Sequence, residues 1–111
     1  MCKLLDYKIV AIARGIDEAH IIPTIQALID GGIKAVELPL SHSSKESYKE
    51  TLNIIKKVHD TFGDKIYLGA GTVLSTKEVE DAARAGAEYM ISPNMNVHVI
   101  KKTKELGKGS M

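Results

Sequence analysis

The sequence predicts an α/β fold in which short strands and helices alternate to build a parallel sheet. Apolar runs too short for helices alternate with longer stretches whose apolar residues recur at helical spacing. Glycines stand where these stretches end, because glycine accepts the left-handed backbone angles that close a helix. Four strand–helix units joined by short connections imply right-handed crossovers, and therefore strands that all run in parallel.

The composition limits the class of protein. A chain of 111 residues is one domain or part of one, and its net charge of +1 argues against a nucleic-acid or acidic partner. Cys2 is the single cysteine, which excludes an internal disulfide and favours a reducing compartment. The apolar run 9–13 is too short for a signal-peptide core or a membrane span. These features predict a soluble cytoplasmic protein.

The first strand–helix unit covers residues 8–30. Residues 8–13 form a buried strand in this prediction, and the strand ends at Arg14. Asp17 is a candidate N-cap for a helix that runs to about Asp30. Pro23 interrupts the helical pattern, so the regular helix could instead begin near Pro23.

The second unit contains a carboxylate where a buried strand should have none. After Gly31 and Gly32, residues 33–40 are apolar on both faces of a strand except for Glu37. A solvated edge position or an ion pair would be the ordinary explanation for this glutamate. Ser43 and Glu46 then form the pattern of a capping box that opens a long helix. The buried stripe of that helix is predicted to be Tyr48, Leu52, Ile55 and Val58.

Two further units complete the predicted alternation. A third strand over 65–68 ends in the segment 69–72, and a helix capped by Ser75 and Glu78 runs to Gly86. A fourth strand over 87–91 ends at Ser92-Pro93-Asn94, and a last helix covers about 96–106. No structure is predicted for 108–111.

Polar side chains gather where the predicted strands end. In parallel α/β folds chemistry takes place at the carboxyl ends of the strands. Arg14, Glu37 and Thr72 would meet there and suit a small anionic substrate, with Glu37 able to move protons. Simple pairing of Arg14 with Glu37 explains the same pattern equally well.

Two other kinds of site receive little support. The segment Gly69-Ala70-Gly71 follows a strand, but Leu74 stands where a dinucleotide loop needs its third glycine. The four histidines lack the spacing of metal ligands, and only His42 lies near the carboxyl ends of the predicted strands. We therefore expect no metal and no cofactor.

Three motifs resemble a known enzyme family. The segments 36–40 (VELPL), 68–74 (LGAGTVL) and 90–94 (MISPN) look like successive motifs of the 2-keto-3-deoxy-6-phosphogluconate and 4-hydroxy-2-oxoglutarate aldolases. Residues 12–15 and 28–32 resemble the first strand and first helix end of that family. Pro39 is closer to the phosphogalactonate branch. The resemblance covers nearly the whole chain.

The resemblance implies a fold, a reaction and roles for three residues. Residues 1–111 would be one partial domain, the N-terminal (βα)4 half of a (β/α)8 barrel. The family cleaves a 2-keto-3-deoxy-6-phospho sugar acid to pyruvate and glyceraldehyde 3-phosphate through a lysine Schiff base, without a metal. Glu37 would be the general acid/base, Thr72 would hold the pyruvate carboxylate, and Arg14 would bind an anionic end or carboxylate. Family members are homo-oligomers, commonly trimers.

The chain departs from the family pattern in two respects. Many members have an arginine four residues after the glutamate, where this chain has Ser41. The resemblance also stops before the strand that carries the Schiff-base lysine. We therefore expect a truncated aldolase that is inactive by itself. The competing hypothesis is a non-catalytic half-barrel module that binds small anions or self-associates through its open edges.

Overall fold

The computed structural model describes residues 7–111, and Cys2 lies outside this range. The described elements are β1 (Val10–Ile12), α1 (Glu18–Asp30), β2 (Ala35–Pro39), α2 (Lys45–Phe62), η2 (Gly63–Lys65), β3 (Tyr67–Gly71), α3 (Thr76–Ala85), β4 (Tyr89–Met90), α4 (Val97–Glu105) and β5 (Gly109–Ser110). Strands and helices alternate as predicted.

The strands form one parallel sheet in the order β1-β2-β3-β4-β5. Each strand therefore pairs with the next one along the chain, as consecutive units do in a barrel. The predicted α/β class with a parallel sheet is confirmed, and the arrangement is that of a partial barrel.

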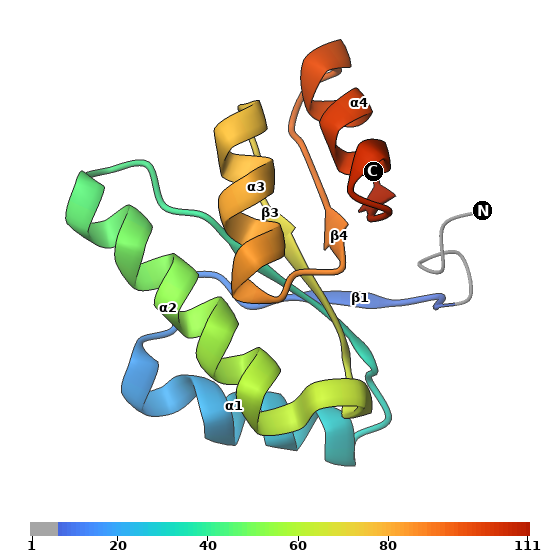
Figure 1. Cartoon of the computed structure of the whole chain (residues 1–111). Helices are drawn as coiled ribbons and strands as arrows, with labels where there is room; N and C mark the ends of the chain where they lie inside the picture. Colours follow the sequence, from blue (N-terminus) through green and yellow to red (C-terminus); the bar gives the residue numbers. More distant parts are fainter. Residues whose placement is uncertain (1–6) are drawn as a thin grey trace.

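The two faces of the sheet have different environments. One face packs against the helices, which Figure 1 shows arranged around the strands. This core includes Val36, Leu38 and Leu68 from the strands, and from the helices Ile21, Ile25, Ile55, Val58, Val79 and Val99. On the opposite face, Ala35, Tyr67 and Tyr89 form a smaller cluster. Glu37 lies on this second face, in register with Ile12 and Gly69.

One local prediction is confirmed over its alternative, and two need correction. Helix α1 begins at Glu18 with Asp17 as its N-cap, as predicted, and continues through Pro23, so the alternative start near Pro23 is wrong. The proline is tolerated because the carbonyl that its missing N–H would have bonded belongs to Ala19, which is exposed to water. Helix α2 is capped by Ser44, whose side chain exchanges hydrogen bonds with Ser47 in place of the predicted Ser43–Glu46 box. Residues 109–110 form strand β5, for which no structure was expected.

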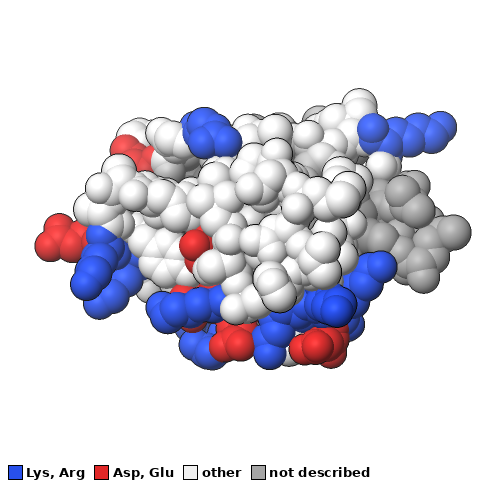
Figure 2. Space-filling view, turned by 90° about the horizontal axis from the view of Figure 1, so that it is seen from above, with Lys and Arg blue, Asp and Glu red and all other residues white. Residues whose placement is uncertain are grey.

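The surface of the described chain shows no large region of one charge in the view of Figure 2. Lysine and arginine side chains alternate with aspartate and glutamate along one edge, and much of the remaining face is uncharged. None of the helices in residues 7–111 combines the length and the apolar character that crossing a membrane requires.

Candidate active site

Arg14, Glu37 and Thr72 lie on three neighbouring strands or directly after them. Arg14 follows β1, Glu37 is in the middle of β2, and Thr72 is the first residue after β3. The Ala13 N–H donates to the Glu37 carbonyl at 3.0 Å, and the Leu40 N–H donates to the Gly71 carbonyl at 2.9 Å. These bonds hold the three segments together at the carboxyl edge of the sheet.

Arg14 and Thr72 share a hollow from which Glu37 is absent. The hollow has a volume of about 570 Å³ and lies between the loops that follow β1 and β2. Its wall also contains Ser41 and His42. Glu37 lies behind this hollow, on the face of the sheet opposite the helices. The three predicted residues therefore reach the same edge of the sheet, but from two different faces.

The Glu37 side chain is largely buried, its carboxylate oxygens keep some contact with solvent, and no close polar partner is observed for them in residues 7–111. The residue is 4% exposed, and among residues 7–111 no hydrogen bond or ion pair of its carboxylate is observed. Burial raises the pKa of Glu37, and the charge of Arg14 acts in the opposite direction with a smaller effect. No Arg14–Glu37 contact is present among the ion pairs of residues 7–111, so the ion pair considered from the sequence is replaced by a longer-range effect of the Arg14 charge. A carboxyl group of this kind can keep a proton at a pH where ordinary glutamates are ionised.

Two glycines of β3 leave space for side chains of the neighbouring strands. A Cβ atom on Gly71 would overlap the Glu37 carboxylate, and a Cβ atom on Gly69 would overlap the ring of Tyr89. Neither glycine has a positive φ. Both are therefore required for space and not for backbone freedom. The sequence showed the Gly-Ala-Gly pattern but gave no sign of which side chains would cover it.

Thr72 has a backbone conformation that its side chain disfavours. Its φ is +56°, and it is the one non-glycine residue with positive φ in residues 7–111. The neighbouring peptide groups are fixed on both sides, by the Leu40–Gly71 bond of 2.9 Å and by the Val73 N–H bond to the Ile91 carbonyl at 3.1 Å. Bonds to the residues that directly follow β2 and β4 thus maintain the strain at Thr72, and such strain is common at binding sites.

Thr72→Gly is expected to raise the free energy of unfolding by about 0.5–1 kcal/mol, because glycine removes a left-handed penalty of about 1–2 kcal/mol. Chemical denaturation measures the change. Thr61→Gly is the matched control, since Thr61 lies in the regular helix α2. There glycine is expected to lower stability by about 0.5–1 kcal/mol. Equal losses at both positions would contradict the strain at Thr72.

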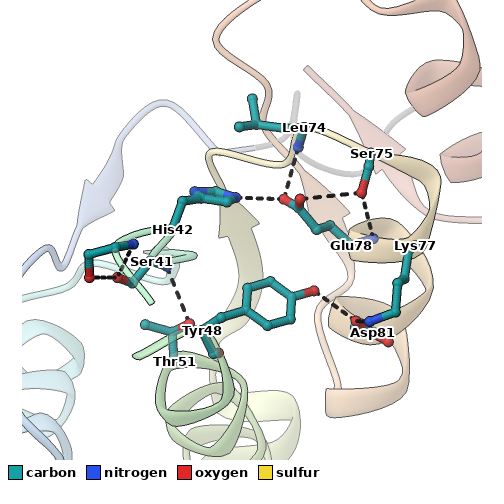
Figure 3. Close-up of polar contacts among 10 residues, drawn as sticks. Ser41, His42, Tyr48, Thr51, Leu74, Ser75, Lys77, Glu78 and Asp81 are labelled. Atoms are coloured by element: carbon teal, nitrogen blue, oxygen red, sulfur yellow. Dashed lines mark hydrogen bonds and ion pairs between the residues drawn. The ribbon is translucent and has the colours of Figure 1, made fainter. Parts of the chain in front are cut away.

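A polar network joins the loop after β2 to the start of α3 (Figure 3). His42 Nε2 lies 2.8 Å from Glu78 Oε1, which also accepts from the Leu74 N–H at 3.1 Å. Tyr48 Oη donates to Asp81 at 2.8 Å. Burial and the Asp81 carboxylate raise the pKa of Tyr48 above its usual value, so the phenol remains a donor. The network fixes the loop that carries Ser41 against the loop that carries Thr72.

Neither Ser41 nor the histidines form part of a recognisable metal site within the described part of the chain. Ser41 lies four residues after Glu37, and its hydroxyl donates to Ser47 Oγ at 2.9 Å. His42, the histidine predicted near the carboxyl ends of the strands, contacts Glu78 as described above. No group of three or more metal-ligating side chains is found within residues 7–111.

Comparisons with known proteins identify close relatives. The family model described as KDPG and KHG aldolase matches residues 2–108. The 2-dehydro-3-deoxy-6-phosphogalactonate aldolase of Escherichia coli (strain K12) is 35% identical over 99 residues, which are 89% of this chain and 45% of that protein. A probable enzyme of the same name from Rhizobium meliloti (strain 1021) is 31% identical, over 96% of this chain and 48% of that protein.

A solved structure agrees with the sequence comparisons. The structure of native KDPGal superposes with a TM-score of 0.83 at 33% identity, over 99% of this chain and 50% of that one. The chain thus spans about half the length of the curated relatives that it matches.

Proposed function

The chain belongs to the KDPG and KHG aldolase family, and from this premise we propose that it takes part in cleaving a 2-keto-3-deoxy-6-phospho sugar acid to pyruvate and glyceraldehyde 3-phosphate. The observation that carries the proposal is the Glu37 carboxyl, with its raised pKa, above Gly71, the residue that precedes the strained Thr72. A proton-transfer group next to an anion-binding edge fits a reaction in which a keto acid gains and loses protons.

Each candidate residue has a separate role in this proposal. Glu37 gives a proton to the hydroxyl that leaves as water when the carbinolamine becomes an imine. It also moves the proton of the enamine step, after the C–C bond has broken and the imine has accepted its electron pair. Thr72 holds the pyruvate carboxylate, and Arg14 holds an anionic end or carboxylate of the substrate.

The proposal does not assign the Schiff-base nucleophile to residues 7–111. Each strand in this range lacks a lysine. Lys34 and Lys65 precede their strands and are exposed at the opposite edge of the sheet from Thr72. The proposal therefore gives this chain the proton-transfer and anion-binding groups. By the same family resemblance it would act in the cytoplasm, as part of a homo-oligomer.

A second candidate function is an anion-binding module without catalysis. It is favoured by one observation, that Arg14 and Thr72 line the hollow while Glu37 does not. The two functions differ in whether Glu37 responds to the ligand. In an aldolase the carboxyl group must lie within reach of the bound keto acid, whereas a simple anion site has no need of it.

Pyruvate titration followed by NMR separates the two functions. Aldolase chemistry predicts that pyruvate changes the signals of Thr72 and of the Glu37 carboxyl, and that inorganic phosphate leaves the carboxyl signal unchanged. Thr72→Val is expected to weaken pyruvate binding by about 10- to 100-fold, the effect of one hydrogen bond to a charged carboxylate. An equal response to both anions, confined to the region around Arg14, would support the binding module instead.

Borohydride trapping tests where the nucleophile lies. The chain is incubated with pyruvate and borohydride, and its mass is then measured. We expect no reduced pyruvate adduct on the lysines of residues 7–111, because none of them lies in a strand. A covalent adduct located by fragmentation on one of these lysines would show that the nucleophile is within this range.

A further inference from the structure

The direction of the Glu37 side chain depends on its neighbours across the sheet. Gly69 lies between Glu37 of β2 and Tyr89 of β4 in the register of the strands. Residues of adjacent parallel strands that are in register share a face, so the side chains of Glu37 and Tyr89 approach each other over Gly69. The space above Gly69 is too small to hold both of these side chains.

Tyr89 occupies the space above Gly69. Its ring fills the position of the absent Gly69 side chain, and the residue is fully buried. Its Oη reaches across β3 and donates to the Val36 carbonyl at 2.8 Å. This bond fixes the backbone of β2 at the residue before Glu37. The backbone of β2 is therefore fixed beside Glu37. The Glu37 side chain cannot extend over Gly69, the residue in register with it, because the Tyr89 ring fills that space.

The Glu37 carboxylate lies instead above Gly71. Gly71 is two residues nearer the carboxyl edge and on the same face of β3 as Gly69. The carboxylate fills the place that a Gly71 side chain would take. Since φ of Gly71 is not positive, the backbone would accept alanine. The three atoms nearest to an added Cβ at this position all belong to the Glu37 carboxylate.

We propose that Gly71 and Tyr89 are positioning residues that direct the Glu37 carboxylate toward the edge of the sheet that bears Thr72. Tyr89 closes the space above Gly69, and Gly71 opens the next space along the strand. The importance of this direction for catalysis rests on the proposed function, but the geometry does not. Without the bare surface of Gly71, the carboxylate would move away from Thr72 and into solvent.

The test measures the Glu37 carboxyl in Gly71→Ala by ¹³C NMR over a range of pH. The alanine methyl displaces the carboxylate from its buried place, so the pKa of Glu37 is expected to fall toward the ordinary value of 4.5. Gly31→Ala is the matched control, because φ of Gly31 is −83° and an added Cβ meets Ala27 O at 3.4 Å, an ordinary contact. This control is expected to leave the pKa of Glu37 unchanged.

A second variant covers the case in which Gly71→Ala folds poorly. Glu37→Asp shortens the side chain by about 1.5 Å, one carbon–carbon bond, and so withdraws the carboxylate from the new methyl group. Gly71→Ala is therefore expected to lower the midpoint of urea unfolding less in the Glu37→Asp background than in the wild type. An unchanged pKa in folded Gly71→Ala, or equal losses in both backgrounds, would overturn the proposal.

The two proposals fail in different ways. The carboxyl titration needs no substrate, so it reports positioning whether or not Glu37 transfers protons. If Glu37 is not the acid/base group, Gly71→Ala still shifts its pKa while pyruvate leaves its signal unchanged. If the positioning proposal is wrong, pyruvate changes the Glu37 signal while Gly71→Ala leaves the pKa as in the wild type.

Discussion

Gly69→Ala is expected to lower the free energy of unfolding by about 2–5 kcal/mol, through overpacking and loss of a buried hydrogen bond. The added methyl group would overlap the Tyr89 ring, which is enclosed on all sides. The ring can make room only by leaving the Val36 carbonyl, which then loses its 2.8 Å bond inside the protein. Urea unfolding of wild type and variant gives the change.

Two further variants separate overpacking from the loss of the hydrogen bond. Tyr89→Phe keeps the ring and removes the donor, so it is expected to cost about 0.5–1.5 kcal/mol, the net value of one hydrogen bond, because the Val36 carbonyl also takes part in the β2–β3 ladder. In Gly69→Ala with Tyr89→Leu, the methyl group meets a smaller side chain, and part of the stability should return. Gly31→Ala shows the effect of the same substitution in an open place. A loss at Gly69 no larger than at Gly31 would contradict the close packing.

The order and type of the elements could be predicted because the signals for them are local. Helical periodicity, glycine stops and caps such as Asp17, Ser75 and Asn96 depend on residues close in sequence. Strand β5 carries no such signal. It is formed by main-chain bonds to β4, from the Gly109 N–H to Glu88 O at 3.0 Å and from the Met111 N–H to Met90 O at 2.9 Å. Any two residues placed there could make these bonds.

The candidate site could be predicted only in part, for a related reason. Parallel strands end at one edge, so the sequence was enough to predict that Arg14, Glu37 and Thr72 would gather there. The sequence could not reveal that Glu37 lies on the face away from the hollow. That arrangement depends on the register of three strands, which puts Glu37, Gly69 and Tyr89 in one row. Strand register follows from the packing of the whole sheet.

Glu37→Gln is expected to stabilise the chain at neutral pH by about 0.5–2 kcal/mol and to have no such effect in acid. Burial raises the pKa of Glu37 above its ordinary value of 4.5. Below pH 4.5 the carboxyl is protonated in the folded and the unfolded chain, so the neutral amide gives no advantage. As the pH rises through the folded pKa, the folded chain must ionise a desolvated group that the unfolded chain has already ionised in water. The wild type therefore loses stability across this range.

Urea unfolding of wild type and Glu37→Gln from acid to neutral pH measures this difference. Glu46→Gln is the matched control, because Glu46 is exposed in the first turn of α2, where a negative charge is favourable. It is expected to lose about 0.3–1 kcal/mol at neutral pH, the opposite sign. If the difference in free energy of unfolding between Glu37→Gln and the wild type were the same at every pH, the shape of the side chain and not its charge would explain the difference. A gain confined to the range where the carboxylate is ionised would show that Glu37 lowers the stability of the fold, as expected of a group that serves chemistry.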